Sequence, residues 1–179
     1  MSDADTSSPL LMTEFDYQLP TDLIAQFPLE RRSESRLLVL DRSKPELEFT
    51  RFDQLPQFLN PGDVLVFNDS RVLPARLLGA RATGGAVEFL LLRRIAGNRW
   101  RALAKPAAKL RPGELIIIHS KSGENSATAT LAMKHSDGQV EIELDRELAA
   151  RLSDYGRMPL PPYITQRLDD DDRYQTVYS

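Results

Sequence analysis

The sequence predicts a mixed α/β domain interrupted by an inserted antiparallel β-barrel of about six strands. Between residues 74 and 145, strand-like runs recur at short intervals with Gly-containing turns between them, as in hairpins and small barrels. On both sides of this region, short helical and strand patterns alternate instead. We therefore expect 13–73 and 146–179 to form one discontinuous α/β domain, 74–145 to be the inserted barrel, and residues 1–12 to be disordered.

The first flank is expected to contain two short helices and three strands. An N-cap at Thr21–Asp22 predicts a helix over 23–26, and Asp53 predicts another over 55–59. Compact or alternating apolar runs predict strands over 36–41, 48–52 and 64–67. The third strand is expected to be buried and to end at four polar residues, 68–71.

The inserted region should contain six strands, over 75–81, 86–95, 99–105, 114–119, 127–134 and 139–144. A helix is expected to begin at Asp145 or Arg146, and the proline-rich stretch 157–163 excludes helix and central strand. Four acids at 169–172 could cap a helix that runs to residue 179. A helix start without a following helix suggests that the chain is a fragment of a longer protein.

Composition excludes several classes of protein. The chain has 179 residues with no cysteine and two histidines, which excludes disulfides, thiol nucleophiles and cysteine-ligated metals and argues against a multi-histidine site. No apolar run approaches the roughly 20 residues that span a bilayer, and the acidic, polar N-terminus resembles no signal or transit peptide. We expect a cytoplasmic protein with no membrane contact and no metal.

The charge is unevenly distributed. The net charge is -3, yet residues 68–111 carry ten bases and two acids, a local net charge of +8. A basic middle inside an acidic protein indicates a local polyanion site, and the preference for arginine suits RNA. A solvated face of a β-domain explains the same charge.

Asn68, Asp69, Ser70 and Arg71 form the most informative cluster. Side chains at the end of a buried strand often bind ligands, and these four offer an amide, a carboxylate, a hydroxyl and an anion-binding guanidinium. The same residue types also form Asx turns, so a simple turn remains open.

Three further features have two interpretations each. Thr83–Gly85 could cradle a phosphate but reads better as a β-turn, because no helix follows it. Trp100, between Arg99 and Arg101, could stack on a base or pack inside the barrel. His119 and His135 fit surface or turn positions better than metal ligation.

Taken together, the motifs resemble the S-adenosylmethionine:tRNA ribosyltransferase-isomerases of queuosine biosynthesis. The resembling segments run in order through most of the chain: Phe15–Pro20, Leu23–Gln26, Ser35–Leu40, Pro61–Asp69, Arg71–Arg76, Thr83–Gly85, Leu160–Ile164 and Arg173–Tyr178. Ser70 stands where the family usually has Thr, and the run 105–109 departs from an Arg-Pro-Ser-Lys-like pattern. The resemblance covers the N-terminal half of such a protein, so we expect this chain to be truncated.

The resemblance implies an enzyme with an α/β domain split by a β-barrel. It also implies the following reaction. The ribosyl moiety of S-adenosylmethionine moves to 7-aminomethyl-7-deazaguanine at the tRNA wobble position and rearranges to epoxyqueuosine, with release of adenine and methionine. S-adenosylmethionine is then a co-substrate, with no tightly bound cofactor, and the partner is the anticodon loop of tRNA. The full-length family is expected to be monomeric.

Site residues follow as hypotheses from the resemblance and the residue chemistry. Asp69 is the candidate catalytic base or ribose-binding carboxylate. The candidate substrate-binding residues are Asn68, Ser70, Arg71, Tyr163 and Tyr174. The candidate tRNA-binding residues are Arg76, Arg99, Arg101, Lys105, Lys109 and Arg111. A non-catalytic RNA-binding β-barrel module explains the basic region equally well, and an inactive fragment with an exposed interface is a third possibility.

Overall fold

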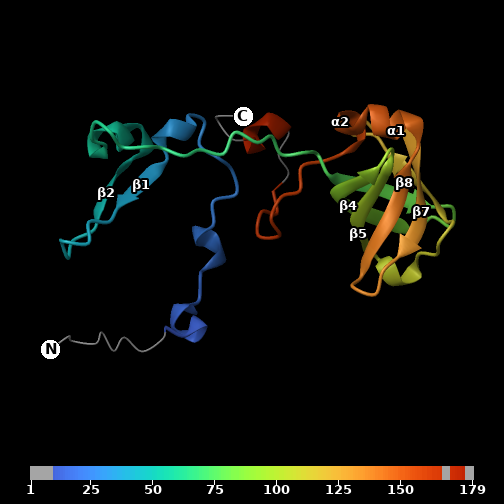
Figure 1. The fold of residues 1–179 in the computed structure, drawn as a ribbon, viewed down its shortest axis with the longest axis horizontal. Helices are drawn as coiled ribbons and strands as arrows, with labels where there is room; N and C mark the ends of the chain where they lie inside the picture. The colour runs from blue at the N-terminus through green and yellow to red at the C-terminus, as the bar shows by residue number, and fades with distance from the viewer. Residues whose placement is uncertain (1–9, 167–169, 176–179) are drawn as a thin grey trace.

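Residues 10–166 and 170–175 are described by a computed structural model, in which a closed barrel and a small two-stranded sheet lie apart (Figure 1). The small sheet belongs to the N-terminal flank, and the segment 170–175 lies between the two. The predicted fold class is confirmed: short helices and a small sheet accompany an antiparallel barrel of six strands.

The barrel consists of β3 to β8, and its strands match the prediction to within a residue at either end. The strands are β3 (Arg76–Arg81), β4 (Ala86–Ala96), β5 (Arg99–Lys105), β6 (Leu115–His119), β7 (Ser126–Lys134) and β8 (Gln139–Leu144). They pair in the order β3-β4-β5-β8-β7-β6, and β6 returns to β3. Closure leaves no free sheet edge, so the ladder hydrogen bonds of the barrel are satisfied internally.

Alternating apolar residues fill the barrel. Along β8, Val140, Ile142 and Leu144 are buried while the acids between them face outward, as the sequence alternation predicted. Phe89 and Trp100 also contribute to this core, Phe89 fully buried and Trp100 packed against it. Trp100 therefore packs against the barrel core, which answers the packing-or-stacking question for this residue in favour of packing.

The backbones of β3 and β6 lie so close together at Gly79 that only glycine fits there. A Cβ at Gly79 on β3 would lie 2.3 Å from the Ile117 carbonyl oxygen on β6, across the seam where the barrel closes. Val87 and Ile118 pair with Gly79 from the two neighbouring strands. The missing side chain lets β3 and β6 approach closely enough to close the barrel.

Short helices seal one end of the barrel. They are α1 (Arg146–Ala150) and α2 (Leu152–Tyr155). The helix α1 begins at Arg146, one of the two expected starts. Asp145 caps it, because its carboxylate accepts from the Leu148 N–H at 2.7 Å, and the same carboxylate accepts from Thr128 on β7. Burial opposes ionisation of Asp145, but the hydrogen bonds from Leu148 and Thr128 outweigh it and lower its pKa. The α1 helix is thus tied to the barrel wall.

The N-terminal flank is organised differently. It contains β1 (Arg36–Val39), β2 (Glu48–Arg51) and four 3-10 helices, η1 (Met12–Phe15), η2 (Thr21–Leu23), η3 (Arg32–Glu34) and η4 (Phe52–Phe58). The strands confirm the predictions for 36–41 and 48–52. The helices are 3-10 turns that lie two or three residues before the expected positions, and neither Thr21 nor Asp53 serves as a side-chain cap. From residue 10 to residue 74 no side chain is buried.

The predicted buried strand over 64–67 is wrong. These residues form no strand, and Val64 and Val66 are 85% and 90% exposed. A β-strand is stable only when a neighbouring strand satisfies its backbone, and neither sheet of the described residues includes 64–67. The apolar run instead crosses in irregular backbone from the small sheet towards the barrel (Figure 1).

The C-terminal segment contains one further element. Asp171–Tyr174 forms the 3-10 helix η6, capped by the Asp170 carboxylate, which accepts from the Asp172 N–H at 2.9 Å. The expected capping by the acids is therefore present, but the helix ends at Tyr174, Gln175 is not helical, and 176–179 lie outside the described residues. The predicted disorder of 1–12 also falls mostly outside them. The division into 13–73 with 146–179 around 74–145 stays a prediction.

The cap gives a stability prediction. Asp145→Ala should lower the free energy of unfolding by about 1 kcal/mol at pH 7, because Leu148 and Thr128 lose an acceptor. Since the folded-state pKa is depressed, this contribution is present above the unfolded pKa of about 3.9 and is lost as the pH falls through the folded value. Urea unfolding followed by Trp100 fluorescence measures the difference, with Glu124→Ala as control. The loss should shrink as the pH is lowered from 7 towards the folded-state pKa of Asp145, and a loss that does not change with pH would contradict the assignment.

Candidate functional site

A cavity of about 810 Å³ lies beside the barrel. Its walls come from β3, from the loop that follows β6, from the proline-rich segment and from the acidic turn at 170–171. The apolar part of the wall is formed by Leu78, Met158, Leu160, Pro161, Pro162 and Ile164. The volume lies within the range of small-molecule sites.

A backbone bridge at the barrel rim brings the proline-rich segment to this position. Arg76 and Arg157 exchange two backbone hydrogen bonds of 3.0 and 2.8 Å. Gly156 makes the approach possible, because a Cβ there would lie 1.8 Å from the Pro74 carbonyl oxygen. Prolines cannot extend this pairing as a strand, so the chain leaves the rim and curves around the cavity.

The cavity carries charges of both signs. Arg76, Lys121 and Arg157 contribute cations, and Asp170 and Asp171 contribute carboxylates. Three of these five are already paired: Arg76 binds Glu88 through two hydrogen bonds of 2.8 and 2.9 Å, and Lys121 and Asp171 pair with each other. Apolar walls with charges of both signs suit a ligand that has a flat apolar body and a zwitterionic end.

The cluster Asn68–Arg71 lies at the surface in irregular backbone. The Ser70 N–H donates to the Asn68 side-chain oxygen at 2.9 Å, which is the Asx-turn geometry that the residue types allow. Asp69 is exposed, and Arg71 pairs with Asp172 at 2.9 Å. The turn thus forms, and it leaves the Asp69 carboxylate open to solvent.

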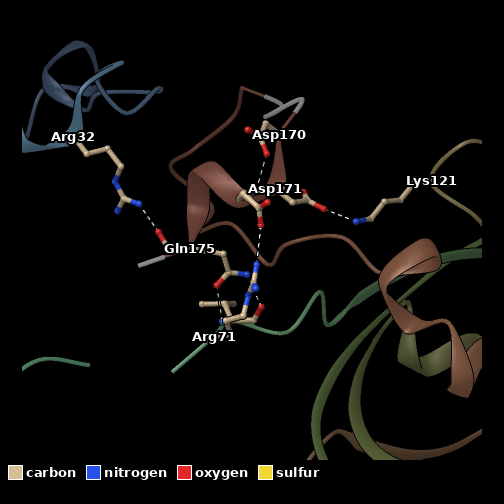
Figure 2. A network of polar contacts seen from close by, with 8 residues as sticks. Arg32, Arg71, Lys121, Asp170, Asp171 and Gln175 are labelled. Atoms are coloured by element: carbon tan, nitrogen blue, oxygen red, sulfur yellow. Dashed lines mark hydrogen bonds and ion pairs between the residues drawn. The ribbon is translucent and has the colours of Figure 1, made fainter. Parts of the chain in front are cut away.

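The acidic turn connects this cluster to the cavity. Asp171 lines the cavity and pairs with Lys121, while the neighbouring Asp172 pairs with Arg71 (Figure 2). Tyr174 ends the same 3-10 helix and is partly exposed. Tyr163, 56% exposed, lies in the proline-rich segment between two cavity-lining residues. Of the candidate substrate-binding residues, Arg71 thus contacts the acidic turn, Tyr174 belongs to it, and Tyr163 lies in the segment that lines the cavity.

The six candidate tRNA-binding cations divide into two groups. Arg76 is held by Glu88, and Arg99 and Arg101 both lie near Glu141, at 3.0 and 3.6 Å. Lys105, Lys109 and Arg111 are exposed and cluster at the connection between β5 and β6, which includes the 3-10 helix η5 (Ala107–Lys109). Within the described part of the chain, Lys105, Lys109 and Arg111 form no close ion pair, although the Arg111 backbone N–H donates to the Glu114 carboxylate at 3.0 Å.

Glu141, on the outside of the barrel, lies close to two of the candidate tRNA-binding arginines. Its side chain is 13% exposed and contacts Arg99, Arg101 and His135, the last at 3.0 Å. His135 thus forms a hydrogen bond with Glu141, and no group of three or more His, Asp or Glu side chains in the described residues is arranged to hold a metal. Thr83–Gly85 forms the β3–β4 hairpin turn, as the turn interpretation predicted.

Sequence reasoning did not assign a role to four residues that shape this region. Lys121 and Arg157 lie in ordinary loop sequence, and no local pattern marks them. Gln26 and Gln175 did stand inside motifs, and their side chains contact distant backbone. Their position in the motifs was the one sequence feature that could have pointed to a role. It could not reveal the contacts, because these are made with residues more than 100 positions away.

Comparison with known proteins places the chain in a family. Residues 12–179 match the model of the family described as queuosine biosynthesis protein. This chain belongs to that family. It is 44% identical over 169 residues to the S-adenosylmethionine:tRNA ribosyltransferase-isomerase of Acetivibrio thermocellus, a match that covers 94% of this chain and 49% of that protein.

A solved structure is also similar, the S-adenosylmethionine tRNA ribosyltransferase of Thermotoga maritima. It is 38% identical, with 73% of this chain and 44% of that one covered and a TM-score of 0.34. The chain thus spans about half the length of the family members it matches. Within the described residues, no helix has the length and apolar character needed to cross a membrane.

The Glu141 cluster gives a second stability prediction. Glu141→Gln should lower the free energy of unfolding by about 1–3 kcal/mol, because Arg99, Arg101 and His135 lose their shared partner on a largely buried wall. Glu143→Gln is the matched control, since Glu143 is the next outward residue on β8 and is exposed. Urea unfolding at neutral pH measures both, and equal effects would contradict a special role for Glu141.

Proposed function

We propose that this chain is part of an enzyme that transfers the ribosyl moiety of S-adenosylmethionine to 7-aminomethyl-7-deazaguanine at the tRNA wobble position. The transferred unit rearranges to epoxyqueuosine, and adenine and methionine leave. The observation that carries this proposal is the family match over residues 12–179, together with 44% identity to a transferase-isomerase of that name. Because the chain spans about half of that relative, its own activity belongs to the proposal.

The cavity supports S-adenosylmethionine as the co-substrate. The Asp170 carboxylate would complement the sulfonium or the ammonium, and Arg157 would complement the methionine carboxylate. Asp171 would have to exchange Lys121 for the ligand to contribute in the same way. The apolar wall would receive the adenine ring. Such a ligand needs no metal for its chemistry, because the sulfonium already acidifies the neighbouring C–H bonds.

Asp69 is the proposed general base. A carboxylate can remove a proton activated by the sulfonium, or can keep the attacking amine unprotonated. The exposed position of Asp69 in the Asn68–Arg71 turn leaves it accessible to a bound nucleoside. Asn68, Ser70 and Arg71 would bind the substrate beside it, and Tyr163 and Tyr174 would stack on a base.

The tRNA would contact the barrel. Lys105, Lys109 and Arg111 offer exposed cations at one connection, and a wobble base in a loop can turn outward without opening a duplex. Arg76, Arg99 and Arg101 would have to exchange a carboxylate for a phosphate. A cytoplasmic location and a monomeric enzyme complete the proposal.

A non-catalytic RNA-binding module is the second candidate, favoured by the closed barrel and its exposed basic loop. The two functions differ in ligand: the enzyme binds S-adenosylmethionine, whereas the module binds RNA alone.

Calorimetry tests the proposed co-substrate. The chain should bind S-adenosylmethionine with a saturable heat. In the full-length enzyme, Asp69→Asn should reduce turnover at least 100-fold with little change in affinity, because the amide cannot accept the proton. Ser126→Ala, on the barrel, is the control. Unchanged turnover in a folded Asp69→Asn enzyme would refute the role of Asp69, and absence of binding by the unmodified chain would favour the RNA-binding module.

Salt-dependent RNA binding tests the two groups of cations. Lys109→Ala and Arg111→Ala should each weaken binding to a tRNA anticodon stem-loop and reduce the slope of log K against log salt by about 1. Arg101→Ala should change this slope less, because Glu141 already neutralises Arg101. Fluorescence anisotropy across a salt series measures the slopes. A larger slope change for Arg101→Ala than for Lys109→Ala would contradict this division.

A further inference from the structure

Two glutamine side chains connect segments that are far apart in the sequence. Gln26 donates to the Tyr163 carbonyl at 3.0 Å and accepts from the Thr165 N–H at 2.8 Å. Gln175 accepts from the Val72 N–H at 2.8 Å and donates to the Val72 carbonyl at 2.9 Å (Figure 2). Each amide therefore satisfies one donor and one acceptor of another segment's backbone, as a neighbouring β-strand would.

The segments held in this way are the ones that form the candidate site. Tyr163 and Thr165 flank Ile164 at the wall of the cavity. Val72 follows the Asn68–Arg71 turn directly, so a fixed Val72 backbone restricts the position of Arg71. Neither segment has regular secondary structure that would hold it otherwise.

The surroundings distinguish Gln175 from the other contacts of the acidic turn. Gln175 is 9% exposed, whereas the Arg71–Asp172 pair joins two largely exposed side chains. Exposed ion pairs contribute little and are screened by salt, while a buried amide with both partners satisfied is directional. The backbone carbonyl of Gln175 also accepts a hydrogen bond from the Arg32 side chain. The Arg173 side chain donates to the backbone carbonyls of residues 28–30. The same turn therefore holds the N-terminal flank.

We infer that Gln26 and Gln175 are positioning residues: each fixes the backbone of one wall of the candidate site without contacting the reacting atoms. Gln26 fixes the proline-rich wall, and Gln175 fixes the Arg71–Val72 backbone to the acidic turn. The ligand-binding consequence rests on the proposed function, whereas the backbone contacts themselves do not.

The test compares Gln26→Met, Gln175→Met and the control Gln18→Met in the 179-residue chain. Methionine keeps the length of the side chain and removes every hydrogen bond of the amide, including those that Gln26 makes with the Ile24 carbonyl and the Thr165 hydroxyl. Gln18 is exposed on the N-terminal flank. Trp100 fluorescence reports whether the barrel remains folded, because Trp100 packs against the barrel core and both glutamines lie outside it. Residue-resolved amide hydrogen exchange is the main measurement.

Each variant is expected to affect only the amide that its own glutamine contacts. Gln175→Met should accelerate exchange at the Val72 amide about five- to tenfold and leave the Thr165 amide unchanged, and Gln26→Met should do the reverse. General destabilisation would accelerate both amides together. Cleavage by trypsin after Arg71 should become faster in Gln175→Met alone. Unchanged exchange at the two amides would overturn the inference.

Calorimetry with S-adenosylmethionine tests the consequence for the site. Gln26→Met and Gln175→Met should each weaken binding about fivefold or more, and Gln18→Met should not. Faster exchange with unchanged affinity would overturn the positioning role. If the unmodified chain binds no S-adenosylmethionine, the proposed co-substrate fails, and the exchange pattern alone decides whether the glutamines hold the backbone.

Discussion

Closure of the barrel between β3 and β6 is the constraint on which the arrangement of the site depends. At this seam Gly79 lies against the Ile117 carbonyl, and the absence of a side chain lets β3 and β6, the two ends of the strand order, pair with each other. A closed sheet with a filled interior is rigid, because its core is packed and it has no free edge. The rim of β3 therefore provides a fixed platform, and the backbone bridge between Arg76 and Arg157 extends that platform to one wall of the cavity.

The opposite walls are held by a different kind of interaction. From residue 10 to residue 74 no side chain is buried, so apolar packing within the chain does not fix this flank. Its position relative to the cavity depends on hydrogen bonds from Gln26, Gln175, Arg32 and Arg173 to backbone groups of distant segments. Directional contacts of this kind specify geometry at little cost in buried area, but each contributes only about 1 kcal/mol. The site thus combines a rigid barrel wall with walls that are easier to displace.

The barrel also shows that the number of cations in a sequence does not equal the number available to a polyanion. Residues 68–111 carry a net charge of +8, yet Glu88 and Glu141 engage half of the candidate tRNA-binding side chains. Glu141 lies outside that basic region in the sequence and joins it only because β8 pairs with β5. Of the six candidate tRNA-binding cations, the three that are exposed, Lys105, Lys109 and Arg111, lie in or beside the β5–β6 connection.

The amino-acid sequence was enough to predict the six barrel strands, the exposed and buried faces of β8 and a helix start at Asp145 or Arg146, and it left a turn at Asn68–Arg71 as one of two interpretations. Each of these depends on residues close together in the chain, through period-two alternation, turn chemistry or a local hydrogen bond. Only the tertiary structure decided that β5 lies beside β8, that Val64–Phe67 forms no strand, and that Gln26 and Gln175 reach backbone more than 100 residues away. These features depend on which distant segment supplies the hydrogen-bonding partner, and no local pattern encodes that choice.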